Sequence, residues 1–94
     1  MNLTMKKSIE HAILYTSLIG KQVEILDSKV RKQVGFNGLL VYESAYFLYI
    51  LHKDSIRKLL KSNIVLSLEM DGKIIQVEGH LLKGTLTQRI KKLK

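Results

Sequence analysis

An Asp-Gly pair between two alternating runs of residues is the feature that most limits how this chain can fold. Apolar and more polar side chains alternate over residues 64–70, before Asp71-Gly72, and again over residues 73–79 behind it. Such a pair is typical of a two-residue antiparallel hairpin, because both turn positions need a positive φ. The sequence therefore predicts two paired strands, with Ile75 and Val77 facing the core.

The same period of two occurs earlier in the chain. Val23 and Ile25 alternate with polar residues, which predicts a strand from Lys21 with one buried face. A polar and basic connection, residues 27–33, follows this strand.

Glycine and aromatic residues characterise the next two predicted strands. The strand at residues 34–43 contains Gly38, and glycine inside a strand typically marks a bulge, a bend or the close approach of another backbone. After a short turn, residues 46–52 form a strand that is apolar on both faces, which indicates an outer cover or a partner on one of them. The basic segment 53–61 carries no predicted strand.

Helical spacing marks the start of the chain. Residues 6–19 place Ile9 and Ile13 on one face of a predicted helix, and Gly20 is positioned to end it. The exposed apolar face of this helix needs a cover, so we expect Ile9, Ile13 and the bent strand around Gly38 to bind a partner protein.

The end of the chain is also predicted to be helical. Residues 85–94 begin with Thr85 and Gln88 at the spacing of a capping box. An apolar stripe follows, formed by Leu86, Ile90 and Leu93.

These elements together predict a mainly β protein with one domain, residues 1–94. Five or six short strands with a helix at each end are typical of a small antiparallel barrel, here over residues 21–84. The first residues lack the long apolar segment of a secretory signal, and we expect a cytoplasmic protein.

Net charge indicates the kind of partner. Sixteen Lys and Arg against eight Asp and Glu give +8, which favours an anionic partner, with nucleic acid first and a membrane surface second. No apolar run approaches the roughly 20 residues that cross a bilayer. The predicted nucleic-acid-binding residues are Lys29, Arg31 and Lys32 in the first connection, and Lys83, Arg89, Lys91, Lys92 and Lys94 near the end. A solvated loop and a solubilising tail are the respective alternatives.

Aromatic residues offer a second way to bind a nucleic acid. Tyr42 and Tyr46 are candidates for stacking on unpaired bases, with packing against the protein as the alternative. Burial is expected for Tyr15, Phe47 and Tyr49.

No catalytic or metal site is predicted. Cysteine is absent, which excludes disulfides and thiolate ligands. His11, His52 and His80 lack the spacing of metal ligands, while Glu69 and Asp71 flank a hairpin tip and are better explained as solvent-facing turn residues. No serine has the surroundings of a nucleophile.

Several motifs in order carry a resemblance to a known family. They are Leu18–Ile25, Val34–Ser44, Leu48, Ile50, Asp71-Gly72, Ile75-x-Val77-x-Gly79, Leu81-Leu82 and Arg89–Lys92. In this order they resemble protein component 1 of archaeal and eukaryotic ribonuclease P. The resemblance covers about residues 18–94.

The resemblance implies an Sm-like barrel that acts as an accessory subunit. It implies a ribonucleoprotein that removes the 5′ leader of precursor tRNA, with the active site and its Mg²⁺ in the RNA and no cofactor on this chain. Its partners would be the ribonuclease P RNA, a zinc-ribbon protein subunit and other ribonuclease P proteins, with precursor tRNA contacted indirectly and no membrane. Glu43 would stabilise its strand-turn junction. Two alternatives remain. One is a generic Sm-like or translation-associated RNA-binding barrel, which would form rings or bind RNA without a zinc-ribbon partner, and the other is a basic structural or membrane-surface module.

Overall fold

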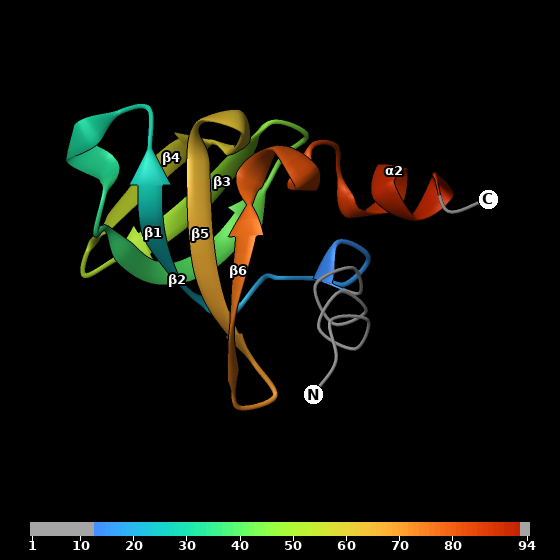
Figure 1. Ribbon diagram of the computed structural model, residues 1–94, viewed down its shortest axis with the longest axis horizontal. Coiled ribbons are helices and arrows are strands. Elements are labelled where there is room, and N and C mark those ends of the chain that lie inside the picture. Colours follow the sequence, from blue (N-terminus) through green and yellow to red (C-terminus); the bar gives the residue numbers. More distant parts are fainter. Residues whose placement is uncertain (1–12, 93–94) are drawn as a thin grey trace.

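Six antiparallel strands form one bent sheet in the computed structural model, which describes residues 13–92 (Figure 1). The strand order is β4-β3-β2-β1-β5-β6. The strands are β1 (Gln22–Ser28), β2 (Asn37–Glu43), β3 (Phe47–His52), β4 (Ser55–Leu60), β5 (Ile64–Met70) and β6 (Lys73–Glu78). The helical elements are the 3-10 helices η1 (Arg31–Gln33), η2 (Lys61–Asn63) and η3 (Gly79–Leu82), followed by α2 (Leu86–Lys91).

The predicted mainly β class is confirmed, but the sheet is open. Strands β4 and β6 are its two edges, and within residues 13–92 no ladder joins them. Irregularities in register at Ile25/Asp27 and at Leu40/Tyr42 accompany the bending, because a bulge increases the local twist of a strand. The ends of the two edge strands come together where η2, which follows β4, contacts η3, which follows β6.

The hydrophobic core fills the concave side of the sheet. Its strand residues follow the predicted alternation: Leu48 and Ile50 of β3 are fully buried, and Ile75 and Val77 of β6 face the same core. The predicted hairpin is confirmed as well, since Asp71 and Gly72 both have positive φ. The remaining core residues are Ile13, Leu18, Val23, Ile25, Leu40, Leu59, Ile64, Leu66, Leu68 and Leu82.

Strand β4 was not predicted. Its sequence is basic, and its burial rises only at the end, at Leu59 and Leu60, so it lacks the alternation that marks a half-buried strand. Pairing decides its structure instead, because all six of its residues are in register with β3.

The predicted helix 6–19 is wrong over residues 14–19. Only Ile13 is helical, and the chain then turns. Ser17 accepts a hydrogen bond from the Ile19 backbone N–H at 3.4 Å, and serine in this role competes with helical hydrogen bonding. Ile13 and Leu18 both reach the core. Residues 6–12, including Ile9, lie outside the described residues.

The glycine at position 38 of β2 is required by a close backbone contact with β3. It is buried, and a Cβ at this position would meet the backbone carbonyl of Leu51 on β3. Glycine is needed here for close approach between backbones. Since β3 already covers the position, the expected partner contact at Gly38 has no accessible surface in this fold.

Replacement of Gly38 by Ala should therefore destabilise the protein. The new methyl group meets backbone, which cannot move aside as a side chain can, so we expect a loss of at least about 2 kcal/mol in the free energy of unfolding. Urea denaturation measures it. Gln76→Ala, on the exposed side of β6, should stay within about 0.5 kcal/mol of the wild type. Equal stability of the two variants would contradict the packing described.

Candidate nucleic-acid interface

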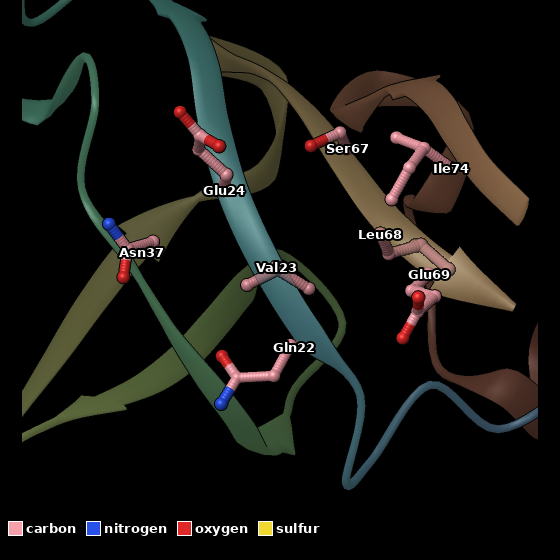
Figure 2. Close-up of a pocket in the computed structure, with 8 residues that line it drawn as sticks. All are labelled: Gln22, Val23, Glu24, Asn37, Ser67, Leu68, Glu69 and Ile74. Atoms are coloured by element: carbon pink, nitrogen blue, oxygen red, sulfur yellow. The ribbon is translucent and has the colours of Figure 1, made fainter. Parts of the chain in front are cut away.

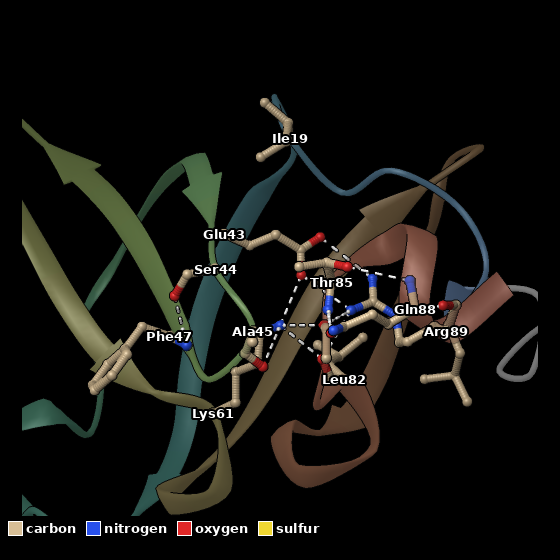
Figure 3. A network of polar contacts seen from close by, with 12 residues as sticks. Ile19, Glu43, Ser44, Ala45, Phe47, Lys61, Leu82, Thr85, Gln88 and Arg89 are labelled. Carbon is tan, nitrogen blue, oxygen red and sulfur yellow. Dashed lines mark hydrogen bonds and ion pairs between the residues drawn. The ribbon is translucent and has the colours of Figure 1, made fainter. Parts of the chain in front are cut away.

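A buried ion network joins the C-terminal helix to the sheet (Figure 3). Glu43, at the end of β2, accepts hydrogen bonds from Lys61 Nζ at 2.8 Å and from Arg89 Nη1 at 3.1 Å on the same oxygen. Its other oxygen accepts from Arg89 Nη2 at 3.3 Å. The side chains of Lys61 and Arg89 are only 1% and 4% exposed. The network therefore holds two cations and one carboxylate away from water.

Two carbonyl groups between η3 and α2 complete the binding of both cations. The Leu82 oxygen lies 2.7 Å from Lys61 Nζ and 2.8 Å from Arg89 Nη1. The Gly84 oxygen lies 3.0 Å and 2.7 Å from the same atoms. Gly84 has a φ of 90°, a conformation that favours glycine. The turn at this residue thus presents both oxygens to the cations.

Two further carbonyls extend the network to distant parts of the chain. The Ala45 oxygen, in the turn between β2 and β3, accepts from Lys61 Nζ at 3.4 Å. The Leu14 oxygen accepts from Arg89 Nε at 2.6 Å. Of the described residues, no buried side-chain nitrogen or oxygen lacks a partner. The network links the N-terminal segment, the β2–β3 turn, η2, η3 and α2.

The network changes the pKa of two of its members. Burial alone would raise the pKa of Glu43, but the hydrogen bonds from Arg89 and Lys61, together with their charges, lower it overall. Burial lowers the pKa of Lys61, and the positive charge of Arg89 lowers it further, while Glu43 opposes both effects. Glu43 is thus the counter-charge on which both cations depend. Glu43 was expected to stabilise the junction between β2 and the following turn, and in the structure it does so through ion pairs with Lys61 and Arg89.

The C-terminal helix is capped as predicted but packs differently. Thr85 and Gln88 form both hydrogen bonds of a capping box. The predicted apolar stripe is wrong: Ile90 is 43% exposed, whereas Arg89 is buried. The Arg89 guanidinium donates its hydrogen bonds toward the protein interior, so the helix packs with Arg89 and not Ile90 facing inward. The spacing of the apolar residues does not predict this orientation. Leu93 lies outside the described residues.

The predicted C-terminal basic group is therefore divided. Arg89 has no free surface for RNA, because its donors are bonded within the protein. Exposed side chains remain at Lys83, Lys91 and Lys92. Lys94 lies outside the described residues.

A second group of basic residues lies in η1 and the β3–β4 hairpin, at the end of the sheet away from α2 (Figure 1). Lys29, Arg31 and Lys32 are all exposed beside or within η1. The β3–β4 hairpin adds Lys53 and Arg57, which were not among the predicted RNA-binding residues.

Aromatic contacts bring these two segments together. The Arg57 guanidinium lies 4.9 Å from the centroid of the Phe36 ring, and Phe36 lies 5.5 Å from the ring of His52. His52 also hydrogen-bonds the Asn37 carbonyl through Nδ1 at 2.7 Å. We name Lys29, Arg31, Lys32, Lys53 and Arg57 the hairpin-end group. The basic character of residues 53–61 was the signal that could have found its second half.

The other predicted site residues have mixed positions. Tyr42 and Tyr46 are 58% and 55% exposed, as stacking would require. The three aromatics expected to be buried, Tyr15, Phe47 and Tyr49, are half-buried. Ile13, expected to face a partner, is fully buried in the core of this chain, so it has no surface to offer.

One open depression of about 310 Å³ lies on the outer face of the sheet (Figure 2). Its lining includes the carboxylates of Glu24 and Glu69 and the apolar side chain of Ile74. Two carboxylates make it unsuitable for phosphate. Over residues 13–92 no grouping of His, Cys, Asp and Glu could hold a metal ion, and no helix of that part is long and apolar enough to cross a membrane.

Comparison with known proteins gives three findings. The family model for ribonuclease P/MRP, subunit p29, matches residues 11–92. Ribonuclease P protein component 1 of Methanocaldococcus jannaschii is 34% identical over 83 residues, which is 87% of each chain. The solved structure of Mth11, described as a homologue of human RNase P protein Rpp29, has a TM-score of 0.59 and 26% identity, and the match covers 79% of this chain and 97% of that one. The similarity thus extends to both sequence and fold.

Replacement of Glu43 by Gln should remove the counter-charge and destabilise the fold. Two buried cations would then face each other unpaired, so we expect a loss of about 3–5 kcal/mol in the free energy of unfolding at neutral pH. Because the network lowers the pKa of Glu43 below the ordinary value of a glutamate, its contribution is present above that ordinary value and is lost as the pH falls through the folded pKa.

The difference in unfolding free energy between the wild type and Glu43→Gln should consequently shrink in acid. Urea denaturation over a pH series measures it. Glu24→Gln makes the same chemical change at an exposed position of β1 and should have little effect at any pH. A difference that stays constant into strong acid would contradict the role of the carboxylate charge.

Proposed function

Since the chain belongs to the ribonuclease P/MRP p29 family and is a ribonuclease P protein subunit, we propose that it supports the catalytic RNA without performing chemistry itself. In this proposal the ribonucleoprotein removes the 5′ leader of precursor tRNA, and the active site with its Mg²⁺ lies in the RNA. The observation that carries the RNA-binding part is the pair of exposed basic surfaces at opposite ends of one ordered sheet.

The proposed contacts are with phosphates. Lysine and arginine bind phosphate oxygens by charge and hydrogen bonding and fix the position of a protein on the nucleic acid. The hairpin-end group supplies five such side chains, against the acids Asp27 and Asp54 in the same segments. At the other end, the ion network fixes α2, so Lys91 and Lys92 are held in a defined orientation.

A supporting role fits the chemistry of the charged residues. Catalysis needs a group whose proton or charge is available to substrate. The three members of the buried network use their charges and hydrogen bonds within the protein. The charged groups that remain accessible include the exposed Lys and Arg side chains of the two basic surfaces, which are suited to binding phosphates.

The proposed partners are the ribonuclease P RNA, a zinc-ribbon protein subunit and further ribonuclease P proteins, in the cytoplasm. The attachment of the N-terminal segment supports a protein partner near α2. Arg89 bonds the Leu14 carbonyl, and Ile13 enters the core next to it in sequence. Residues 13 and 14 therefore lie beside the C-terminal helix. A partner protein bound at α2 would contact this N-terminal segment as well.

Two matched pairs of substitutions test the phosphate contacts. Arg31→Ala/Lys32→Ala and Lys91→Ala/Lys92→Ala each remove two exposed charges, one pair at each end. Each should weaken binding to ribonuclease P RNA and reduce the slope of log K against log[salt] by about 0.7–0.9 for every phosphate that the variant no longer neutralises. Fluorescence anisotropy over a salt series measures both quantities.

Lys73→Ala is the control for the removal of a charge elsewhere, because Lys73 lies at the tip of the β5–β6 hairpin. It should leave the salt slope unchanged. If a double variant retained the wild-type slope, its end of the sheet would not be part of the RNA interface.

Reconstitution tests the accessory role. Ribonuclease P RNA and the other protein subunits should cleave precursor tRNA faster when this chain is added, and the increase should require the zinc-ribbon subunit. The chain alone should not cleave. Single-turnover cleavage rates with and without the chain measure this, and an unchanged rate with a folded chain would contradict the proposed function.

A further inference from the structure

We propose that the outer face of β2, β3 and β4 binds unpaired RNA nucleotides by stacking their bases on tyrosine and phenylalanine rings. This inference rests on the proposed RNA-binding function and adds a second kind of contact to it. Tyr42, Tyr46, Phe47 and Tyr49, with Lys58 and Lys83, form the surface, which we name the aromatic face.

Strand pairing puts the central members of the aromatic face in one row. Tyr42 of β2 pairs with Tyr49 of β3, and Tyr49 pairs with Lys58 of β4. The core residues Leu48 and Ile50 alternate with Tyr49 along β3, so the row points away from the core. The rings of Tyr42 and Tyr49 lie 5.2 Å apart at an angle of 56°. Tyr42 is 58% exposed and leaves much of its surface open to a ligand.

Lysines border the rings at two places. Lys58 Nζ lies 4.2 Å from the centroid of the Phe47 ring. Lys83 Nζ lies 5.8 Å from the ring of Tyr46, whose side chain is 55% exposed. A cation next to an aromatic ring can meet a phosphate while the ring receives the base of the same strand.

The two halves of the outer surface differ in charge. The outer positions of β1, β5 and β6 carry Glu24, Glu69 and Glu78, and two of them line the depression of Figure 2. The acids closest in sequence to the aromatic face are Glu43, buried in the ion network, and Asp54, in the β3–β4 hairpin turn. The outer positions of β2, β3 and β4 that form the aromatic face carry no carboxylate, so an RNA strand meets less repulsion there than on β1, β5 and β6.

Single-stranded RNA fits this surface better than a duplex. The bases of a duplex are already stacked within its helix, whereas unpaired bases can turn outward and stack on aromatic side chains. Ile56, 60% exposed on β4, extends the apolar part of the face toward the hairpin-end group. A strand that crosses the face would thus have phosphate contacts at both ends of its path.

Tyr42→Ala and Tyr46→Ala in the full chain test the proposal. The probes are a single-stranded RNA oligonucleotide that contains 2-aminopurine and a blunt-ended RNA duplex with the same number of phosphates. Each substitution should weaken single-strand binding about fivefold or more, and it should reduce the quenching of 2-aminopurine that stacking causes. Duplex binding should not change, and Tyr42→Phe, which keeps the ring, should bind like the wild type.

Ile74→Ala is the matched control, because Ile74 is an apolar residue 72% exposed on the acidic half, and its replacement should leave both affinities unchanged. Tyrosine variants that bind the single strand as the wild type does, or that lose duplex binding equally, would overturn the proposal. Intact RNA binding with weakened binding of another ribonuclease P protein would overturn it in favour of protein docking. A wild-type chain that binds neither RNA would instead reject the proposed function itself.

Discussion

The arrangement of this protein depends on one buried carboxylate. Glu43 is the counter-charge of both Lys61 and Arg89, which come from η2 and α2, two elements far apart in the sequence. The set still carries one net positive charge, and carbonyl groups of the backbone provide the rest of its stabilisation. A buried ion pair adds little stability compared with apolar residues of the same shape, yet removal of one partner is costly. The network therefore acts by specificity: any other arrangement of the surrounding segments would leave a buried charge unpaired and would have a much higher free energy.

Those segments are the ones that hydrogen bonds between strands do not fix. The sheet is open, and the ends of its two edge strands come together where η2 meets η3. Gly79 permits that approach, because a side chain there would meet the carbonyls of Lys61 and Ile64. Helix α2 has only six residues, far below the length at which isolated helices are stable in water. Arg89 is thus what holds this helix on the protein, and polar bonding replaces the closure that a complete barrel would provide.

Sequence patterns predicted the parts of the fold whose causes are local. The β5–β6 hairpin follows from Asp71-Gly72, whose two residues adopt the backbone conformation of the turn. The cap of α2 follows from Thr85 and Gln88, which hydrogen-bond each other's backbone N–H groups. The ion network joins residues 43, 61 and 89, and no local pattern reveals such a combination. Strand β4 escaped prediction for a similar reason, because pairing with β3 and not its own alternation determines it. Of the predicted RNA-binding residues, the lysines of the described region are exposed and remain candidates. Arg89 is buried in the ion network, which its positive charge alone could not predict.

The position of each charge matters more for RNA binding than the net value of +8. The protein extends over 37 × 30 × 24 Å, whereas charges in physiological salt are screened over about 8 Å. In the proposed function, the hairpin-end group and the lysines of α2 therefore act as separate local sites, and the acidic half of the sheet, which carries Glu24, Glu69 and Glu78, does not cancel them. Carboxylates on that half would still repel a phosphate that came close. If both basic ends bind phosphates as proposed, an RNA molecule can meet this protein in few orientations, because the sheet and the ion network fix the separation of the two ends.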